Sequence, residues 1–275
     1  MRLSRVGKRY GRRGPWILKE ATLAVGPGEL VRIEGANGSG KSTLLKLIAG
    51  VEPPSTGSID GPGRRAYVPE RFPPALPFDA RTYLHHLGRV HGLSAAEADR
   101  RAAHWLDRFG IADRAGTPLS RLSKGTCQKV AVIQALLADA ELLLLDEAWT
   151  GLDQAARSLL DEVAADRAAR GGRVLFVDHD PNRLAGLITA AYLVQDGSLR
   201  AVDAVPDGPS GQRLVRIEVD GRLPDRLPGA PQREPRPDGT TLLKVPAPHS
   251  DALLRHLLTA TPPAHIRAVH PEGEA

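Results

Sequence analysis

Residues 35–43 read Gly-Ala-Asn-Gly-Ser-Gly-Lys-Ser-Thr, and this stretch decides the fold. A short strand is predicted directly before it, over residues 30–34, and a helix directly after it, over residues 42–49. Together they match the pattern G-x-x-x-x-G-K-[ST] in the strand–loop–helix setting that cradles nucleotide phosphates. The alternative is an ordinary glycine-rich turn before a helix, which the lysine, the hydroxyl and both flanks make much less favoured.

The side chains of this loop suit a triphosphate and its metal ion. Glycines let successive backbone N–H groups point inward at an anion, and the positive end of the following helix adds to that field. Lys41 can reach the terminal phosphates, and the Ser42 hydroxyl can hold a Mg²⁺ ion. The candidate nucleotide-binding residues of the loop are Gly35, Asn37, Gly38, Gly40, Lys41, Ser42 and Thr43.

The chain has 275 residues, enough for one large domain or for one domain with a small addition. Its single cysteine, Cys127, excludes an internal disulfide, suits a reducing cytosol and is expected to be buried rather than reactive. Apolar runs fall short of the about 20 residues of a membrane-spanning helix. The first residues, Met1–Arg5, contain no hydrophobic signal core, so secretion is not expected. The net charge is +5, but the arginines are scattered and only 4% of residues are aromatic, so nucleic-acid binding is not expected.

Strands and helices alternate over most of the chain, with one interruption. Residues 1–34 are predicted to form an N-terminal antiparallel β part, and residues 77–124 an inserted helical subdomain. A capping box at Ser94 predicts one of its helices, which ends near Phe109. The uniformly apolar run Leu142–Leu145 indicates a buried strand of a parallel sheet. We therefore expect an α/β fold for a first domain over residues 1–205.

The end of this domain and the remainder of the chain carry weaker signals. Asp180-Pro181 is predicted to start a helix, because aspartate is a good N-cap and proline suits the first helical position. Residues 206–275 are predicted to be a small α+β appendix that begins with a linker over residues 206–211. Its expected strands lie at 214–219, 241–245 and 265–269, and its expected helix at 250–258.

Five further motifs are in register with the loop. They are Tyr10, Leu122-Ser123-Lys124-Gly125, Leu142–Asp146 with Glu147, Gly151-Leu152-Asp153, and His179. Over roughly residues 1–200 they resemble the ATP-binding cassette (ABC) ATPases. The resemblance gives them the roles of adenine-stacking ring, signature, Walker B strand with its carboxylates, D-loop and switch histidine. Each motif alone is weak, but all of them in this order are hard to obtain by chance.

The resemblance implies a P-loop ATPase that uses Mg²⁺, and the residues make physical sense in these roles. Asp146 ends a buried strand, so its carboxylate emerges at the sheet edge where ligands bind and can hold the metal ion. Glu147 is the candidate base that orients the attacking water, and His179 can contact the γ-phosphate. With Lys41 they are the candidate catalytic residues. The alternatives are that one carboxylate only caps a helix and that the histidine is structural.

Ser123 and Gly125 begin a helix whose N-terminus could bind an anion, although the chain already has a phosphate loop. The resemblance implies that this signature completes the ATP site of a second chain in a head-to-tail dimer. Ser123, Gly125 and the D-loop residue Asp153 are therefore further nucleotide-binding candidates. The alternative for the signature is an ordinary capped helix, and for Tyr10 it is a surface or core tyrosine.

Two residues depart from the pattern of the family. Glu70 stands where a glutamine is usual, and because its oxygen could still contact Mg²⁺, it is a candidate metal and nucleotide residue. Several exporter-type cassettes carry such a glutamate and the Leu-Ser-Lys-Gly signature, so the resemblance implies an exporter. Trp149 is large for its site and is expected to pack at the dimer seam or against the D-loop.

The motion of a cassette without a membrane segment must be delivered to another protein. The resemblance implies the ATPase subunit of a transporter, peripheral on the inner face of the cell membrane, that drives a separate transmembrane permease through ATP-induced dimer closure. The apolar residues Phe72, Leu76 and Phe78 could grip that permease or simply pack against the core. Alternatives are a soluble ABC ATPase acting on ribosomes or DNA, and an inactive scaffold, which would need the loss of Lys41 or Glu147.

Overall fold

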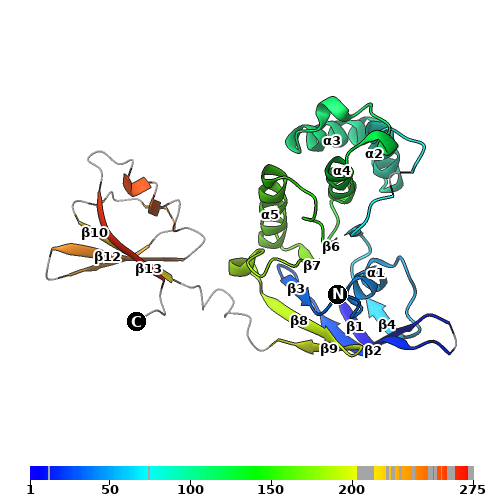
Figure 1. Ribbon diagram of the computed structural model, residues 1–275, viewed down its shortest axis with the longest axis horizontal. Coiled ribbons are helices and arrows are strands. Elements are labelled where there is room, and N and C mark those ends of the chain that lie inside the picture. Colours follow the sequence, from blue (N-terminus) through cyan, green and yellow to red (C-terminus); the bar gives the residue numbers. More distant parts are fainter. Residues whose placement is uncertain are drawn as a thin grey trace. The chain divides into compact units, whose positions relative to one another are not determined.

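The chain divides into two compact units, Met1–Asp203 and Ala204–Ala275. Figure 1 shows the computed structural model with its helices and strands labelled. The structure describes residues 1–11, 13–73, 75–202, 214–220, 223, 227–228, 231–236, 239–246, 250, 253–254, 256–258 and 264–271.

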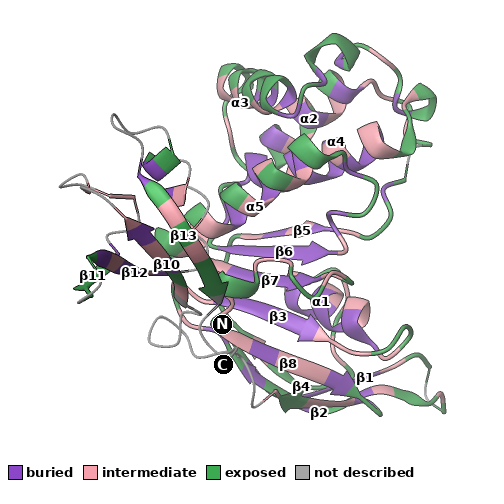
Figure 2. Ribbon diagram, turned by 60° about the vertical axis from the view of Figure 1, so that its left-hand side comes forward, coloured by how far each residue is buried: buried purple, intermediate pink, exposed green. Residues whose placement is uncertain are grey.

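A six-stranded sheet forms the centre of the first unit. Its strands in spatial order are β5 (Arg65–Val68), β6 (Leu142–Asp146), β7 (Arg173–Val177), β3 (Leu30–Glu34), β8 (Ala190–Gln195) and β9 (Ser198–Ala201). The first five run parallel, and Figure 2 shows them side by side. All of β6 is buried, because both faces of the sheet are covered. Strand β9 turns back on β8 through Asp196 and Gly197, both at positive φ.

One face of this sheet is covered by helix α1 (Lys41–Ala49) and a small antiparallel sheet. The small sheet has the order β2 (Trp16–Ala24), β1 (Arg2–Arg9) and β4 (Thr56–Asp60). Leu142 and Leu144 of β6 share a core with Leu44 of α1 and Leu3 of β1. The antiparallel β part therefore contains β4 as well, a strand that lies beyond the predicted residues 1–34.

The opposite face is covered by helix α5 (Gln154–Ala169) and by the helical subdomain. Its helices α2 (Ala80–Val90) and α3 (Ala95–Arg108) pack with α4 (Lys124–Leu137), and the three cluster together in Figure 1. Helix α4 thus extends this helical layer beyond the predicted range 77–124. Leu143 and Leu145 point to this side and share one core with Leu84, Leu106 and Val130. Among the described residues, none of the helices is long and apolar enough to span a membrane.

Short polar side chains begin helices α2 and α3, and the cap at Ser94 is the predicted one. The Asp79 carboxylate accepts a hydrogen bond from the Thr82 N–H at 2.7 Å, and the Ser94 hydroxyl accepts one from the Glu97 N–H at 3.2 Å. Each satisfies a backbone N–H that would otherwise lack a partner in the first helical turn. Phe72 is buried and packs edge-on against Tyr83, so for this ring the core interpretation is the correct one.

The helix expected to start at Pro181 does not form. The structure has turns there, followed by the short 3₁₀ segment η3 (Ala185–Leu187). The Asp180 carboxylate accepts from the N–H of Asn182, two residues on, which is an Asx turn rather than a helix cap. Leu184 then takes a φ of 54°, a left-handed conformation that stops a helix. The prediction of a helix that starts at Asp180-Pro181 is therefore wrong.

The second unit contains an antiparallel sheet. Its strands in spatial order are β11 (Gln232–Pro235), β12 (Thr240–Pro246), β10 (Leu214–Asp220) and β13 (His265–Pro271). Strand β11 is additional to the strands expected at 214–219, 241–245 and 265–269. Leu253 and Leu257 are helical and fully buried against the sheet residues Ile217 and Leu243. The predicted linker over residues 206–211 and part of the predicted helix over residues 250–258 lie outside the described residues.

Candidate nucleotide-binding site

The loop at residues 35–43 joins the carboxyl end of β3 to α1 and depends on its glycines. Gly35 has a φ of 143° and Gly40 one of 109°, both in the region that favours glycine. A Cβ atom on Gly35 would lie 2.5 Å from the carbonyl oxygen of Val194. Gly40 is the N-cap of α1 and brings no side chain, so the first N–H groups of the helix are left for an anion.

Lys41 is folded back onto the loop. Its Nζ donates to the carbonyl oxygens of Gly35 at 2.7 Å and Ala36 at 2.9 Å, and only 7% of the residue is exposed. Carbonyl groups solvate the ammonium without neutralising it. The loop therefore carries a nearly buried positive charge, which a phosphate oxygen can pair with.

The loop and the end of β6 are joined through Asp146. The Ser42 hydroxyl donates to Asp146 Oδ1 at 3.0 Å, and the Tyr67 hydroxyl of β5 donates to Oδ2 at 2.9 Å. Burial raises the pKa of Asp146, although both hydrogen bonds act in the opposite direction. Burial and the nearby Asp146 carboxylate also raise the pKa of Tyr67, so its hydroxyl remains a donor. A carboxylate and a hydroxyl side by side are donors that suit Mg²⁺.

Glu147, the next residue, contacts His179. The Glu147 Oε1 and His179 Nε2 atoms are 2.9 Å apart. Glu147 has a φ of 50°, a left-handed conformation that is costly for a residue with a Cβ. Its N–H donates to the carbonyl oxygen of Val177 at the end of β7, which holds this backbone in place. The Glu147 side chain is 18% exposed and that of His179 is 59% exposed, so the pair faces solvent on one side.

Tyr10 lies near the loop but has partners of its own. Its ring is largely exposed, and its hydroxyl donates to the two Glu52 oxygens at 2.8 and 3.0 Å. Lys8 Nζ lies 5.0 Å from the ring centroid and 3.0 Å from Glu52 Oε2. Burial and the hydrogen bond with Glu52 raise the pKa of Tyr10, while the Thr43 hydroxyl of the loop lowers it. The ring is thus fixed by its hydroxyl and presents an exposed surface beside the loop.

Glu70 follows β5 and is 44% exposed. Its nearest ionic partner in the described part of the chain is Arg71, with Nε 3.5 Å from Glu70 Oε1. Its charge contributes, after burial, to the raised pKa of Asp146. Glu70 therefore lies on the Asp146 side of the site without contacting Asp146 directly.

Ser123, Gly125 and Asp153 form a second group. The Ser123 hydroxyl caps α4 by accepting from the Thr126 N–H at 3.2 Å. A Cβ atom on Gly125 would lie 2.7 Å from the Gly151 carbonyl oxygen, so α4 packs directly on the D-loop. Asp153 caps α5 and lies 2.6 Å from Lys129 Nζ, which is the largest cause of its lowered pKa. Within the described residues, no hydrogen bond or ion pair joins this group to residues 35–43.

Trp149 is not at a surface. It is 2% exposed, and its Nε1 donates to Asp161 Oδ1 of α5 at 2.8 Å. The side chain therefore packs inside the unit and not at the dimer seam, which was the first of its two expected positions, the second being against the D-loop. Sequence reasoning missed Asp161, its partner Arg183, and Tyr67. Tyr67 could have been found from its position near the carboxyl end of β5, where its hydroxyl can reach the edge of the sheet at which ligands bind.

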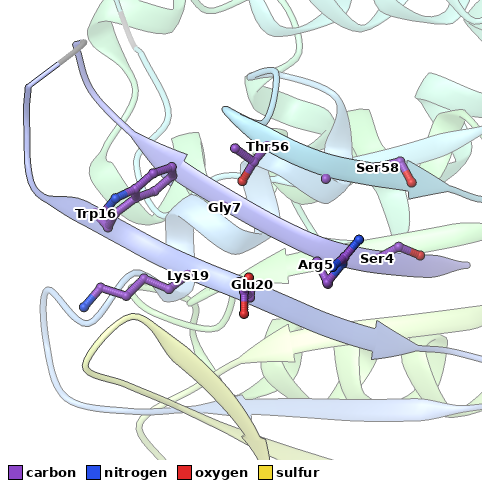
Figure 3. A pocket seen from close by; sticks show the side chains of 9 residues that line it. Ser4, Arg5, Gly7, Trp16, Lys19, Glu20, Thr56 and Ser58 are labelled. Carbon is purple, nitrogen blue, oxygen red and sulfur yellow. The ribbon is translucent and has the colours of Figure 1, made fainter.

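Cys127 is buried as expected, and its thiol points to the carbonyl oxygen of Leu119. A different pocket, of about 630 Å³, lies on the small antiparallel sheet (Figure 3). Trp16, Lys19 and Glu20 of β2 and Arg5 of β1 line it. The residues that line this pocket include none of the predicted site residues, so it is distinct from the nucleotide site.

Comparison with known proteins identifies the family. The family model described as ABC transporter matches residues 18–150. The zinc import ATP-binding protein ZnuC of Paracoccus denitrificans is 38% identical over 220 residues, which are 75% of this chain and 82% of that protein. The aliphatic sulfonates import ATP-binding protein SsuB of Albidiferax ferrireducens is 32% identical over 246 residues, 83% of this chain and 84% of that protein.

A solved structure gives the same result. It is described as an ATP-binding subunit of an ABC transporter and superposes with a TM-score of 0.67 at 27% sequence identity. The match covers 74% of this chain and 90% of that one. The phosphate-loop ATPase fold, with its antiparallel β part and helical subdomain, is therefore confirmed. The chain belongs to the family of ABC transporter ATP-binding proteins, which are ATPases.

Proposed function

We propose that this chain binds ATP at residues 35–43 and hydrolyses it with Glu147 and His179. One observation carries the proposal: consecutive residues at the end of β6 contact the loop and the histidine. Asp146 bonds to Ser42 of the loop, and Glu147 bonds to His179. A group that holds the metal ion and a base that orients water are thus adjacent, which is the arrangement that phosphoryl transfer to water requires.

Each side chain has a defined task in this proposal. Lys41 exchanges the carbonyl oxygens of its own loop for phosphate oxygens when ATP arrives. The Glu147 carboxylate accepts a hydrogen bond from the attacking water and takes up its proton. His179, through Nε2, fixes the orientation of that carboxylate, and its exposed imidazole would contact the γ-phosphate of bound ATP. Tyr10 offers its exposed ring to adenine beside Thr43.

Mg²⁺ fits the donor set at Ser42 and Asp146. The Asp146 carboxylate is 1% exposed, and a buried negative charge is stabilised by a cation. Bound with ATP, the ion would neutralise charge on the β- and γ-phosphates. Glu70 lies on the same side and is the candidate for a further contact.

A second copy of the chain completes the site. Ser123, Gly125 and Asp153 are grouped on α4 and the D-loop, without a hydrogen bond or ion pair to the loop within the described residues. We infer that they face the ATP of a partner chain, so that ATP closes a dimer. The dimer drives a transmembrane permease, at the inner face of the cell membrane.

The direction of transport is not part of the proposal. Glu70 and the Leu-Ser-Lys-Gly signature led to the expectation of an exporter, but the two relatives are both named as import proteins. The exporter type is therefore not supported. The soluble alternative, an ATPase acting on ribosomes or DNA, is not favoured either, because the family is that of transporter subunits.

ATP turnover and size-exclusion chromatography test the proposal. Glu147→Gln should abolish hydrolysis and trap an ATP-bound dimer, because the amide keeps the shape of the carboxylate but cannot take up a proton. Lys41→Ala should abolish ATP binding, with Lys46→Ala on the same helix as the matched control. Unchanged nucleotide affinity of Lys41→Ala, or a Glu147→Gln chain that stays monomeric with ATP, would contradict the proposal.

A further inference from the structure

The segment after Glu147 is anchored inside the first unit by Trp149. The indole Nε1 donates to Asp161 Oδ1 at 2.8 Å, and Asp161 belongs to α5. The indole also contacts Phe176 of β7 edge-on, with ring centroids 5.7 Å apart. Trp149 therefore fixes the chain two residues beyond Glu147 to both a helix and a strand.

The segment around His179 is anchored to the same place by Arg183. Its Nη1 donates to Asp161 Oδ2 at 2.8 Å, and its guanidinium carbon lies 5.4 Å from the centroid of the Trp149 ring. The same guanidinium faces two carboxylates that flank His179. Nη2 lies 3.4 Å from Asp180 Oδ2, and Nε lies 3.7 Å from Asp178 Oδ2. The Arg183 side chain is 13% exposed and that of Asp178 is 10% exposed, whereas the side chains of Asp161 and Asp180 are 32% and 44% exposed.

The backbone after His179 is also held by an arginine of the central sheet. Arg32 of β3 donates from Nη1 to the carbonyl oxygen of Pro181 at 2.7 Å, and from Nη2 to that of Asp180 at 3.1 Å. The side chain of His179 is 59% exposed, but Asp178 and Asp180 on either side of it are held by their contacts with Arg183. The network explains why residues 180–184 form turns instead of the expected helix.

These contacts close a ring that contains the Glu147–His179 pair. One side runs from Glu147 through Trp149 to Asp161, and the other from His179 through its flanking carboxylates and Arg183 to Asp161. Partly buried ion pairs of this kind add little net stability but can fix a geometry. In an active site, a displacement of about 1 Å can lower the rate about a hundredfold.

We propose that Trp149, Asp161 and Arg183 are positioning residues that hold Glu147 and His179 in register for hydrolysis. The inference rests on the proposed function, because it assigns these residues an effect through His179. It also gives Trp149, an unusual residue for its position, a role within one chain. The three side chains do not touch the nucleotide loop, so ATP binding should not depend on them.

Steady-state ATP hydrolysis by the full chain tests this role. Arg183→Met should lower kcat about tenfold or more while KM for ATP changes by less than about twofold, because only the geometry of the reacting groups is disturbed. Arg183→Lys should restore part of the rate. Trp149→Phe, which keeps a ring but removes the N–H donor, should lower kcat by about threefold. The matched control is Arg170→Met, which removes an exposed ion pair with Asp166 at the C-terminal end of α5 and should leave kcat unchanged.

A double-mutant cycle distinguishes positioning from a general loss of stability. If Arg183 acts through His179, Arg183→Met should lower the rate of a His179→Ala chain by less than about twofold. Two results would overturn the inference and leave the proposed function intact. One is a kcat of the double variant that equals the product of the two separate decreases, and the other is a kcat for Arg183→Met equal to that of the wild type.

Hydrogen exchange supplies a readout that does not need turnover. The amides of residues 178–180 should exchange faster in Arg183→Met than in the wild type or Arg170→Met, while those of β6 stay protected. Unchanged exchange at residues 178–180 would overturn the inference. A wild-type chain without ATP hydrolysis would instead count against the proposed function, and the exchange result would still decide whether Arg183 holds this segment.

Discussion

The Ser42 hydroxyl lies 3.0 Å from the Asp146 carboxylate, although the two residues are 104 positions apart in the sequence. The contact joins the first turn of α1 to the end of β6 and sets the loop against the edge of the sheet. It also leaves a carboxylate 1% exposed, with two hydroxyl donors and a raised pKa. A charge kept in such a place lowers stability unless a cation is bound, which is typical of sites selected for function.

Asp146→Asn should therefore stabilise the chain in the absence of Mg²⁺ while abolishing hydrolysis. The amide keeps the shape, and the Tyr67 hydroxyl can accept from its N–H. We expect a gain of about 1 kcal/mol in the free energy of unfolding at pH 7, measured by denaturant titration. Asp166→Asn, on the exposed side of α5, is the matched control and should change the stability by less than about 0.5 kcal/mol.

The pH dependence of that gain follows from the pKa of Asp146. Because burial raises this pKa above the unfolded value of about 4, the folded carboxyl keeps its proton to higher pH, and wild-type stability falls as the pH rises through this range. The difference between Asp146→Asn and wild type should thus be large at pH 7 and small near pH 4. A difference that is constant with pH, or a variant less stable at pH 7, would contradict the assignment of a buried charge.

Much of the first unit could be predicted because its signals are local. Three signals each depend on a few neighbouring residues: the loop at residues 35–43, the cap at Ser94 and the apolar run Leu142–Leu145. The structure has the corresponding elements at these positions. Placement of a carboxylate at the end of a parallel strand likewise followed from the strand alone.

The remainder depends on contacts between residues distant in sequence. The helix signal at Asp180-Pro181 was overridden by the arginines from β3 and from position 183, which hold that segment in turns. The hydrogen bond from Tyr67 to Asp146 and that from Trp149 to Asp161 join separate elements. The sequence around each residue does not indicate which distant residue it will contact. Strand β11 has an exposed, charged sequence and forms only because β12 offers it an edge.

Deletion of residues 204–275 should leave a folded ATPase. In the described part of the chain, the two cores of the first unit contain no residue beyond 203, and the core of the second unit is built around Ile217 and Leu243. We expect cooperative melting of the shortened chain and ATP turnover within about threefold of the full chain. Removal of residues 272–275 alone is the control. Aggregation of the longer deletion would mean that the second unit is needed to cover the first.

Gly125→Ala should separate ATP binding from ATP hydrolysis. The added Cβ would lie 2.7 Å from the Gly151 carbonyl oxygen, and because this neighbour is backbone, α4 and the D-loop must move apart. We expect kcat to fall about tenfold or more, with a loss of about 1–3 kcal/mol in stability, while ATP affinity stays within about twofold because residues 35–43 are untouched. Gly116→Ala is the matched control, since a Cβ there would meet open space. Full turnover by Gly125→Ala would show that the close approach of α4 to the D-loop is not required for catalysis, whereas lost ATP affinity would place Gly125 at the nucleotide of its own chain.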